Sequence, residues 1–201
     1  MVAAGFVDPV MSAQTTFRAV LAATSRPGTV WPIEVELSSH APLSRGAAAV
    51  ALTLCDRDTP IWLDPSLCAT EAVAAWLRFH CLAKVVEQPE AASFAFAADT
   101  RALPPFRHFN VGTVDYPDRS TTIVLLIETF QRGHNLVLRG PGIRNQQLLR
   151  AAPLPDDISE RLKSNRSLFP RGVDLLLVSA DQIVALPRSV RLHTEEERPC
   201  T

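Results

Sequence analysis

The chain has 201 residues, of which 47% are hydrophobic and 20% charged, and its formal net charge at pH 7 is -1. A chain of this length buries roughly 70% of its unfolded surface, enough for a substantial core. The near-neutral charge gives no general attraction to nucleic acid, and the longest uncharged apolar runs, such as 121–127, are too short to span a membrane as a helix.

The first half of the chain predicts helices that alternate with short strands. The first predicted helix begins at Ser12, which can cap it, and ends at Pro27 and Gly28. The residues that recur on one side at helical spacing are Phe17, Val20, Leu21 and Thr24. Strands are expected at 29–37, 59–63 and 92–98, the last half-buried with Phe94 and Phe96 on one side, and the clearest helix at 70–84. The run 47–55 has helical spacing but is too short for periodicity alone to assign.

The second half predicts a central sheet. A long irregular connection covers 99–119, and the apolar run 121–130 is typical of a strand covered on both faces. We expect a neighbouring strand at 135–140, joined by a hairpin turn at 132–135, and then a polar helix at 155–165 capped by Asp156 or Asp157. An apolar hairpin formed by 172–178 and 183–188 should follow, and the tail over about 194–201 is expected to fray. The expected fold is a single α/β domain over 1–201, an α/β/α sandwich with a mixed sheet.

The segment Leu136–Gln147 raises the question of a phosphate loop, because Arg139 precedes a Gly-Pro-Gly sequence. A P-loop needs a lysine that reaches the phosphates, and a dinucleotide fingerprint needs a third glycine, but neither is present. Pro141 also lacks the N–H that an anion-binding nest would use. The segment is therefore interpreted as a structural turn.

Three turns nevertheless place an arginine beside proline and glycine, at Arg26, Arg139 and Arg171, and Arg144 follows the second turn. A guanidinium binds phosphate in bidentate fashion, so these four residues are the candidate anion-binding residues if the sheet gathers the turns at one edge. The alternative is three surface turns with solvated arginines.

Other chemistries lack support in the sequence. The five histidines and four cysteines show no metal-ligand spacing, so no metal site is expected, and there is no familiar serine or cysteine nucleophile motif. His80 is interpreted as a core or interface histidine. Lys84 and Lys163, the only lysines, are expected to be solvated, so no pyridoxal-phosphate site and no other cofactor is predicted. No membrane contact is expected. Because no signal sequence opens the chain, we expect a cytoplasmic location.

Six segments, taken in order, resemble the PhnH family, the H subunits of bacterial carbon–phosphorus lyase. They are 17–30, 52–63, 77–96, 112–121, 136–143 and 169–189, and the resemblance covers roughly residues 6–193. It implies the topology of the large domain of pyridoxal-phosphate transferases without their cofactor site. It also implies a homodimer in isolation and association with the G, I and J subunits.

In that family the complex replaces the adenine of ATP with an alkylphosphonate and forms α-D-ribose 1-alkylphosphonate 5-triphosphate, a step that needs the H subunit. The chemistry is attributed mainly to the I and J subunits, and no catalytic residue can be carried over. The resemblance therefore implies an assisting, non-catalytic subunit. The alternatives are a subunit that adds an arginine-rich phosphate-binding surface to a shared active site and, less favoured, an autonomous small-molecule enzyme.

Overall fold

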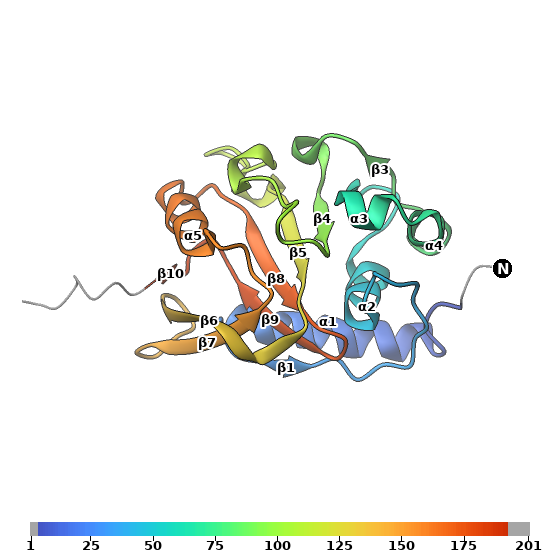
Figure 1. Cartoon of the computed structure of the whole chain (residues 1–201), viewed down its shortest axis with the longest axis horizontal. Helices are drawn as coiled ribbons and strands as arrows, with labels where there is room; N and C mark the ends of the chain where they lie inside the picture. The colour runs from blue at the N-terminus through green and yellow to red at the C-terminus, as the bar shows by residue number, and fades with distance from the viewer. Residues whose placement is uncertain (1–3, 193–201) are drawn as a thin grey trace, which may run out of the picture.

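The computed structural model describes residues 4–192, and its centre is a seven-stranded mixed sheet (Figure 1). The strand order is β1-β9-β8-β5-β4-β2-β3, in which β3, β2, β4, β5 and β8 run parallel and β9 pairs antiparallel with both β8 and β1. The strands are β1 (Trp31–Pro32), β2 (Ile61–Leu63), β3 (Val85–Val86), β4 (Phe94–Ala97), β5 (Thr122–Leu126), β8 (Asp174–Val178) and β9 (Gln182–Leu186). The mixed α/β fold with a large mixed sheet is confirmed; the tail expected to fray lies outside the described residues.

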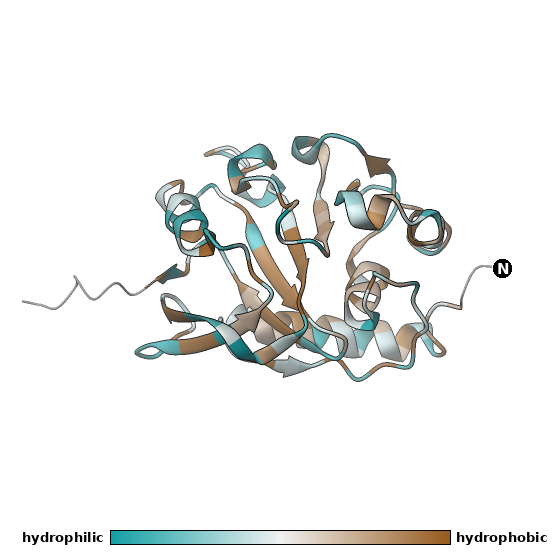
Figure 2. Cartoon of the chain, in the orientation of Figure 1, coloured by the Kyte–Doolittle hydropathy of each residue, from teal (hydrophilic) through white to brown (hydrophobic). Residues whose placement is uncertain are grey.

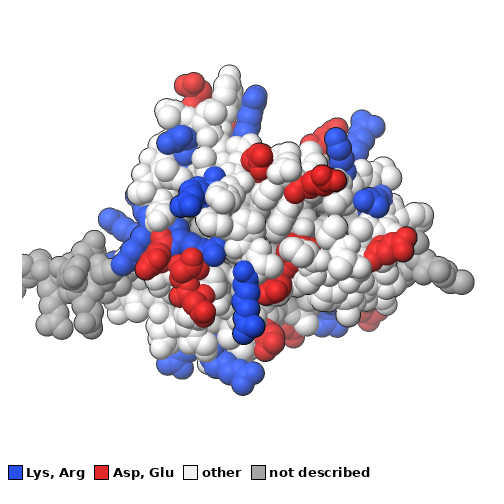
Figure 3. Space-filling model, turned by 45° about the horizontal axis from the view of Figure 1, so that its top comes forward, with Lys and Arg blue, Asp and Glu red and all other residues white. Residues whose placement is uncertain are grey.

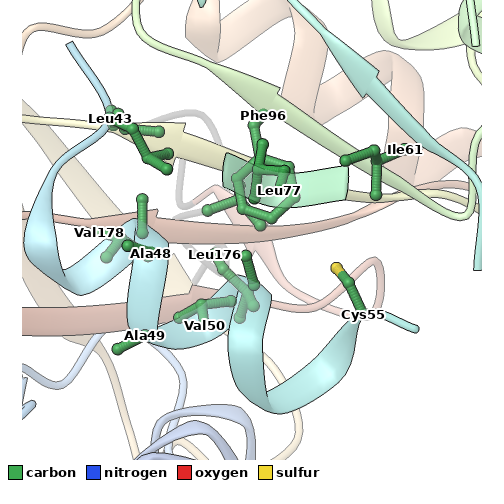
Figure 4. Close-up of a cluster of buried hydrophobic side chains, with 14 of the residues drawn as sticks. Leu43, Ala48, Ala49, Val50, Cys55, Ile61, Leu77, Phe96, Leu176 and Val178 are labelled. Atoms are coloured by element: carbon green, nitrogen blue, oxygen red, sulfur yellow. The ribbon is translucent and has the colours of Figure 1, made fainter. Parts of the chain in front are cut away.

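Helices cover one face of this sheet. They are α1 (Pro9–Ser25), α2 (Arg45–Leu54), the short α3 (Pro65–Cys68) and α4 (Glu71–Cys81). Helix α2 closely approaches the turn after β8, since its buried residues are mostly alanine and a Cβ on Gly46 would lie only 2.3 Å from the carbonyl oxygen of Ser179. Val50 and Leu77 pack with Phe96 and Leu176 in the resulting core (Figure 4). The unassigned run at 47–55 is thus a helix.

The other face carries a second sheet, and here the predicted sandwich needs correction. Three antiparallel strands in the order β10-β6-β7 cover this face together with α5 (Ile158–Ser167) and residues from the 99–119 connection. They are β6 (Thr129–Arg139), β7 (Gln147–Ala152) and β10 (Arg191–Leu192). Hydropathy colouring shows brown strands inside and a teal tip on the β6–β7 hairpin (Figure 2). One helix and a small sheet thus stand where a helical layer was expected.

The predicted pairing of 135–140 with the central strand is wrong. The neighbours of β5 are β4 and β8, and residues 132–135 lie inside β6, where the register with β7 shifts, instead of forming a hairpin turn. The physical reason lies in one-sided burial: Leu136 and Leu138 are buried, whereas Val137 between them is only partly covered. A strand inside the large sheet would need both faces buried.

Helix α1 begins earlier than predicted and buries a different face. Asp8 is its N-cap, accepting hydrogen bonds from the N–H groups of Val10 and Met11 at 3.1 and 3.0 Å, so Ser12 is not the cap. The buried residues are Thr16, Ala19, Val20 and Ala23. Of the predicted face only Val20 is buried, since small side chains let α1 approach α2 and β9. Phe17 and Leu21 are left 45% and 52% exposed.

The remaining predictions are confirmed with smaller changes. Helices α4 and α5 correspond to the predicted helices at 70–84 and 155–165, strand β2 to the predicted strand at 59–63, and β8–β9 to the apolar hairpin. Asp157 occupies the N-cap position of α5, but its side chain makes no cap hydrogen bond. Only two residues of 29–37 are strand, and β4 is buried on both faces where one was expected. The 99–119 connection is irregular except for short 3-10 turns at Phe106–His108 and Pro117–Arg119. Within residues 4–192 no helix is both long and apolar enough to cross a membrane.

Arg188 ties the end of β9 to the start of β8. Its backbone N–H and its Nε both donate to Asp174 Oδ1, at 2.8 and 3.1 Å, and its Nη2 pairs with Oδ2. The same guanidinium donates to the carbonyl oxygen of Pro117 and to Ser120 Oγ, just before β5. A single side chain that is 13% exposed thus joins three segments at the amino ends of the central parallel strands.

We predict that Arg188→Ala lowers the free energy of unfolding by about 1–3 kcal/mol, a value that allows for the 32% exposure of the Asp174 side chain. The loss arises because Asp174 and the Pro117 carbonyl would keep unpaired acceptors. Urea denaturation followed by circular dichroism measures the effect. Arg57→Ala is the control, since the Arg57–Asp58 pair is about four-fifths exposed and should contribute less than about 0.5 kcal/mol. Equal losses in both variants would contradict the prediction.

Candidate functional site

The turn that follows Arg139 is a structural turn that docks on the end of α1. Ile143 donates its N–H to the carbonyl oxygen of Gly140 at 3.1 Å, and Gly140 and Gly142 both have positive φ angles, of 145° and 82°. A Cβ on Gly142 would lie 2.3 Å from the carbonyl oxygen of Ser25, so only glycine allows this approach. The interpretation of this segment as a turn is confirmed.

Two of the three arginine-bearing turns therefore meet. Arg26 follows Ser25 directly, so Arg26 lies beside the turn that carries Arg139 and leads to Arg144. The contacts of Arg171 belong elsewhere: its N–H donates to the carbonyl oxygen of Leu168 after α5, and the next residue, Gly172, donates to the carbonyl oxygen of Val111. The structure pairs the first two turns and places the third on a separate segment.

The four candidate arginines differ in their surroundings. Arg26 is exposed and lies over the ring of Trp31 at 5.5 Å, and Arg144 is also exposed. Arg139 and Arg171 are half-buried, and the Nε atom of Arg139 is buried with no hydrogen-bond partner within residues 4–192. None of the four takes part in an ion pair with another described residue. No carboxylate of the described residues therefore competes with an external anion for these guanidinium groups.

Surface charge on the face shown in Figure 3 gives no preferred anion-binding region. On the face shown in Figure 3, acidic and basic side chains are interspersed and no broad area carries one sign. Local pairing is the better guide, because a guanidinium already bound to a carboxylate has few donors left for a ligand.

A second candidate lies after β4 and β7. A hollow of about 440 Å³ is lined by Thr100, Arg101, Asp156, Asp157, Arg161 and the segment Pro153–Pro155. Residues 98–101 follow the carboxyl end of β4, and ligands of open α/β sheets bind at such ends. Arg161 is already engaged, donating to Asp157 and to the carbonyl oxygens of Leu103 and Pro104. Two arginines and two aspartates balance there, which favours no single ligand charge.

Sequence reasoning missed two carboxylates that organise the sheet. Asp64, fully buried after β2, accepts hydrogen bonds from the N–H groups of Ala98 and Asp99 at 2.7 and 2.6 Å, as well as from Ser66 and Leu67. Asp174 binds Arg188, as described above. A polar residue directly after or at the start of an apolar strand was the only available signal, because the partners lie 34 and 14 residues away.

The thiols and lysines do not form a reactive centre in the part of the chain that the structure describes. Burial raises the pKa of Cys81 to about 11, and burial, helped by Cys81 and Asp56, raises the pKa of Cys55 well above its ordinary value. Lys84 and Lys163 are exposed. No three histidine, cysteine or acidic side chains between residues 4 and 192 are grouped to hold a metal ion. His193 and Cys200 lie outside these residues.

Comparison with known proteins decides the family. Residues 4–193 match the family model described as "Bacterial phosphonate metabolism protein (PhnH)". A protein of Rhizobium meliloti (strain 1021), named α-D-ribose 1-methylphosphonate 5-triphosphate synthase subunit PhnH, is 41% identical over 190 residues, which is 94% of each chain. The chain belongs to the PhnH family. A protein of Stutzerimonas stutzeri named putative C-P lyase subunit protein HtxG is 29% identical over 183 residues, 90% of this chain and 85% of that protein.

The PhnH match confirms the resemblance carried by the six segments. It spans both sheets and therefore includes all four candidate arginines and the hollow after β4. The role of these arginines stays a prediction.

Thiol labelling checks the burial of the cysteines. We predict that at pH 8 Cys68, which is exposed, reacts with a maleimide within minutes, whereas Cys55 and Cys81 stay unlabelled. The thiolate is the nucleophile, and a raised pKa keeps these two thiols protonated until the pH approaches that pKa. Peptide mass spectrometry reads each site, with urea-unfolded protein as the control in which both react. Rapid labelling of Cys81 in the folded protein would contradict the structure.

Proposed function

We propose that this chain is a subunit of a carbon–phosphorus lyase complex in phosphonate catabolism. It would be needed to form α-D-ribose 1-alkylphosphonate 5-triphosphate from ATP and an alkylphosphonate. The observation that carries the proposal is the 41% identity to the Rhizobium meliloti synthase subunit, which extends over 94% of both chains. So long a match leaves little of either chain to supply a separate activity.

An assisting role is the better of the two modes of action. Two deeply buried polar side chains are used for the fold: Asp64 accepts four hydrogen bonds, and Asn165 exchanges two with Val173. Cys55 and Cys81 are held in their protonated form by burial. The groups that a shared reaction would use therefore come from other subunits in this proposal.

The second mode is an arginine-rich surface that binds substrate phosphate. Its support is that Arg26 and the Arg139 turn lie together and that neither arginine is in an ion pair with a described residue. A guanidinium without a carboxylate partner retains donors that phosphate oxygens can accept. In this mode Arg144 would lie at the same surface, and Arg171 would act separately.

The partners in this proposal are the G, I and J subunits, and the isolated chain is a homodimer. The whole chain acts as one domain in the cytoplasm, with the topology of the large domain of pyridoxal-phosphate transferases and without that cofactor. The parallel strands flanked by an antiparallel β9 support that topology.

Helix α1 offers a surface for self-association. Val10, Phe17 and Leu21 form an exposed apolar stripe, since residues 10, 17 and 21 fall on one side of a helix, and they are 76%, 45% and 52% exposed. The same helix contributes Val20 and Thr24 to the lining of a hollow of about 240 Å³. Neighbouring exposed apolar side chains are typical of protein interfaces.

Co-expression tests the subunit assignment. The chain is produced with the G, I and J proteins of the same genome, and an affinity tag is placed on the I protein. We expect the chain to co-purify through size-exclusion chromatography and the complex, but not the chain alone, to form the triphosphate from ATP and methylphosphonate. Failure to co-purify would refute the assignment, and turnover by the isolated chain would refute the assisting role.

A double variant tests the homodimer. We predict that Phe17→Glu with Leu21→Glu converts a dimer into a monomer, because two carboxylates on the stripe would be buried without partners. Analytical ultracentrifugation measures the mass, and Val114→Glu, at a 70% exposed apolar residue in the 99–119 connection, is the control. A wild-type monomer would refute the homodimer, whereas a dimeric double variant would refute only the use of α1.

A further inference from the structure

The small sheet β10-β6-β7 has one buried and one outward face. Leu136 and Leu138 of β6 and Leu149 of β7 are buried against the large sheet. Side chains alternate along a strand, so the residues between them face outward. The outward positions are Asn135, Val137 and Arg139 on β6, Leu148 and Arg150 on β7, and Arg191 on β10. We call these six residues the outer face.

The outer face carries three arginines and no acidic residue. Arg139 and Arg191 are opposite each other in the antiparallel register of β6 and β10. Like charges at directly opposite positions repel each other, and the cost is not offset here, since no ion pair with a described residue involves Arg139, Arg150 or Arg191. Arg150 donates from Nε to Asn135 Oδ1 at 3.0 Å, which orients its guanidinium along this face.

Arg139 has a hydrogen-bond donor that the described residues leave unpaired. Its Nε is buried and has no hydrogen-bond partner among the described residues, although a buried donor is ordinarily paired. The guanidinium is thus partly desolvated, which strengthens its attraction to an anion.

The junction beside this pair is closely packed. A Cβ on Gly140 would lie 3.2 Å from the carbonyl oxygen of Ser189 and 3.3 Å from the Cα of Val190, so the ends of β6 and β10 approach tightly. Gly142 docks on Ser25 on the other side of the turn. The two arginines therefore stand on backbone that is already fixed, and binding would order little further chain.

We infer that Arg139 and Arg191, with Arg150 on the same face, bind the oligophosphate chain of a triphosphate ligand. An anion bound by both guanidinium groups would convert their repulsion into joint attraction, and each fork matches a pair of phosphate oxygens. Three cations on one face fit a chain of three phosphates better than a single carboxylate. The inference rests on the proposed function, in which both ATP and the product carry a triphosphate. The sequence grouped Arg139 with Arg26, Arg144 and Arg171. The register of the small sheet groups it instead with Arg191 and Arg150.

Calorimetry on the isolated full-length chain tests the inference, with inorganic triphosphate as the probe in about 50 mM salt. We expect wild type to bind and Arg139→Gln with Arg191→Gln to bind at least about tenfold more weakly, because two charge-assisted contacts are lost. Arg150→Gln and Arg191→Gln alone, at exposed positions that should not affect folding, should each weaken binding several-fold. Arg57→Gln is the matched control at an exposed arginine on another segment. Thermal melts verify that each variant is folded.

Each outcome bears on one proposal. No binding of triphosphate by wild type, or equal affinity in the double variant and wild type, overturns the inference and leaves the subunit assignment intact. A third outcome is that wild type binds no triphosphate and the double variant no longer co-purifies with the G, I and J proteins. This result assigns the outer face to an acidic partner surface and also overturns the inference. If wild type binds triphosphate through these arginines but fails to co-purify, the proposed function fails and the site stands.

Discussion

The contact between Arg188 and Asp174 joins β8, the end of β9 and the connection before β5 in the large sheet. Asp174 opens β8, the strand beside β5 at the centre of the large sheet, and Arg188 follows β9, which pairs with β8. Through Pro117 and Ser120 the same guanidinium also fixes the end of the long connection before β5. The chain leaves Arg188 for β10 after only two residues. Strand β10 of the small sheet therefore begins next to the charged pair that anchors the large sheet.

Glycine determines how closely the parts approach this anchor. Gly46 lets α2 contact the turn after β8, and Gly142 lets the turn after β6 contact the end of α1. At both sites a Cβ would lie 2.3 Å from a backbone carbonyl oxygen, too close for any side chain. These approaches place Arg26 and Arg139 on neighbouring turns, although 112 residues lie between them in the sequence. Proximity of the two arginines is thus a consequence of backbone packing, whatever they bind.

The sequence predicted what depends on local hydrophobicity. The run Ile123–Leu126 is apolar at every position, which is the pattern of a strand covered on both faces, and Val73, Trp76 and Leu77 mark the inner side of α4. Which strands pair with each other was harder to predict, because a strand with alternating burial such as β6 could lie at the edge of the large sheet or belong to a second sheet. The buried face of α1 was predicted wrongly for a related reason. Phe17 and Leu21 have the periodicity of a core face, but the packing of α1 against α2 buries the alanines of α1 instead. Arg188 could not be distinguished from the other arginines without its partner Asp174.

The two candidate ligand regions differ in how their charges are used. At the hollow after β4, Arg161 is bound by Asp157 and two carbonyl oxygens, so its charge mainly stabilises the connection over α5. On the outer face of the small sheet, three arginines meet no carboxylate of the described chain, and Arg139 keeps a buried donor unpaired. A fold gains nothing from placing Arg139 opposite Arg191 in the strand register, since their mutual repulsion opposes the β6–β10 pairing. An arrangement that costs stability without a structural return is the kind that a ligand or partner explains. In the proposed complex, which forms a triphosphate, three guanidinium groups without a carboxylate partner among the described residues match a triphosphate ligand.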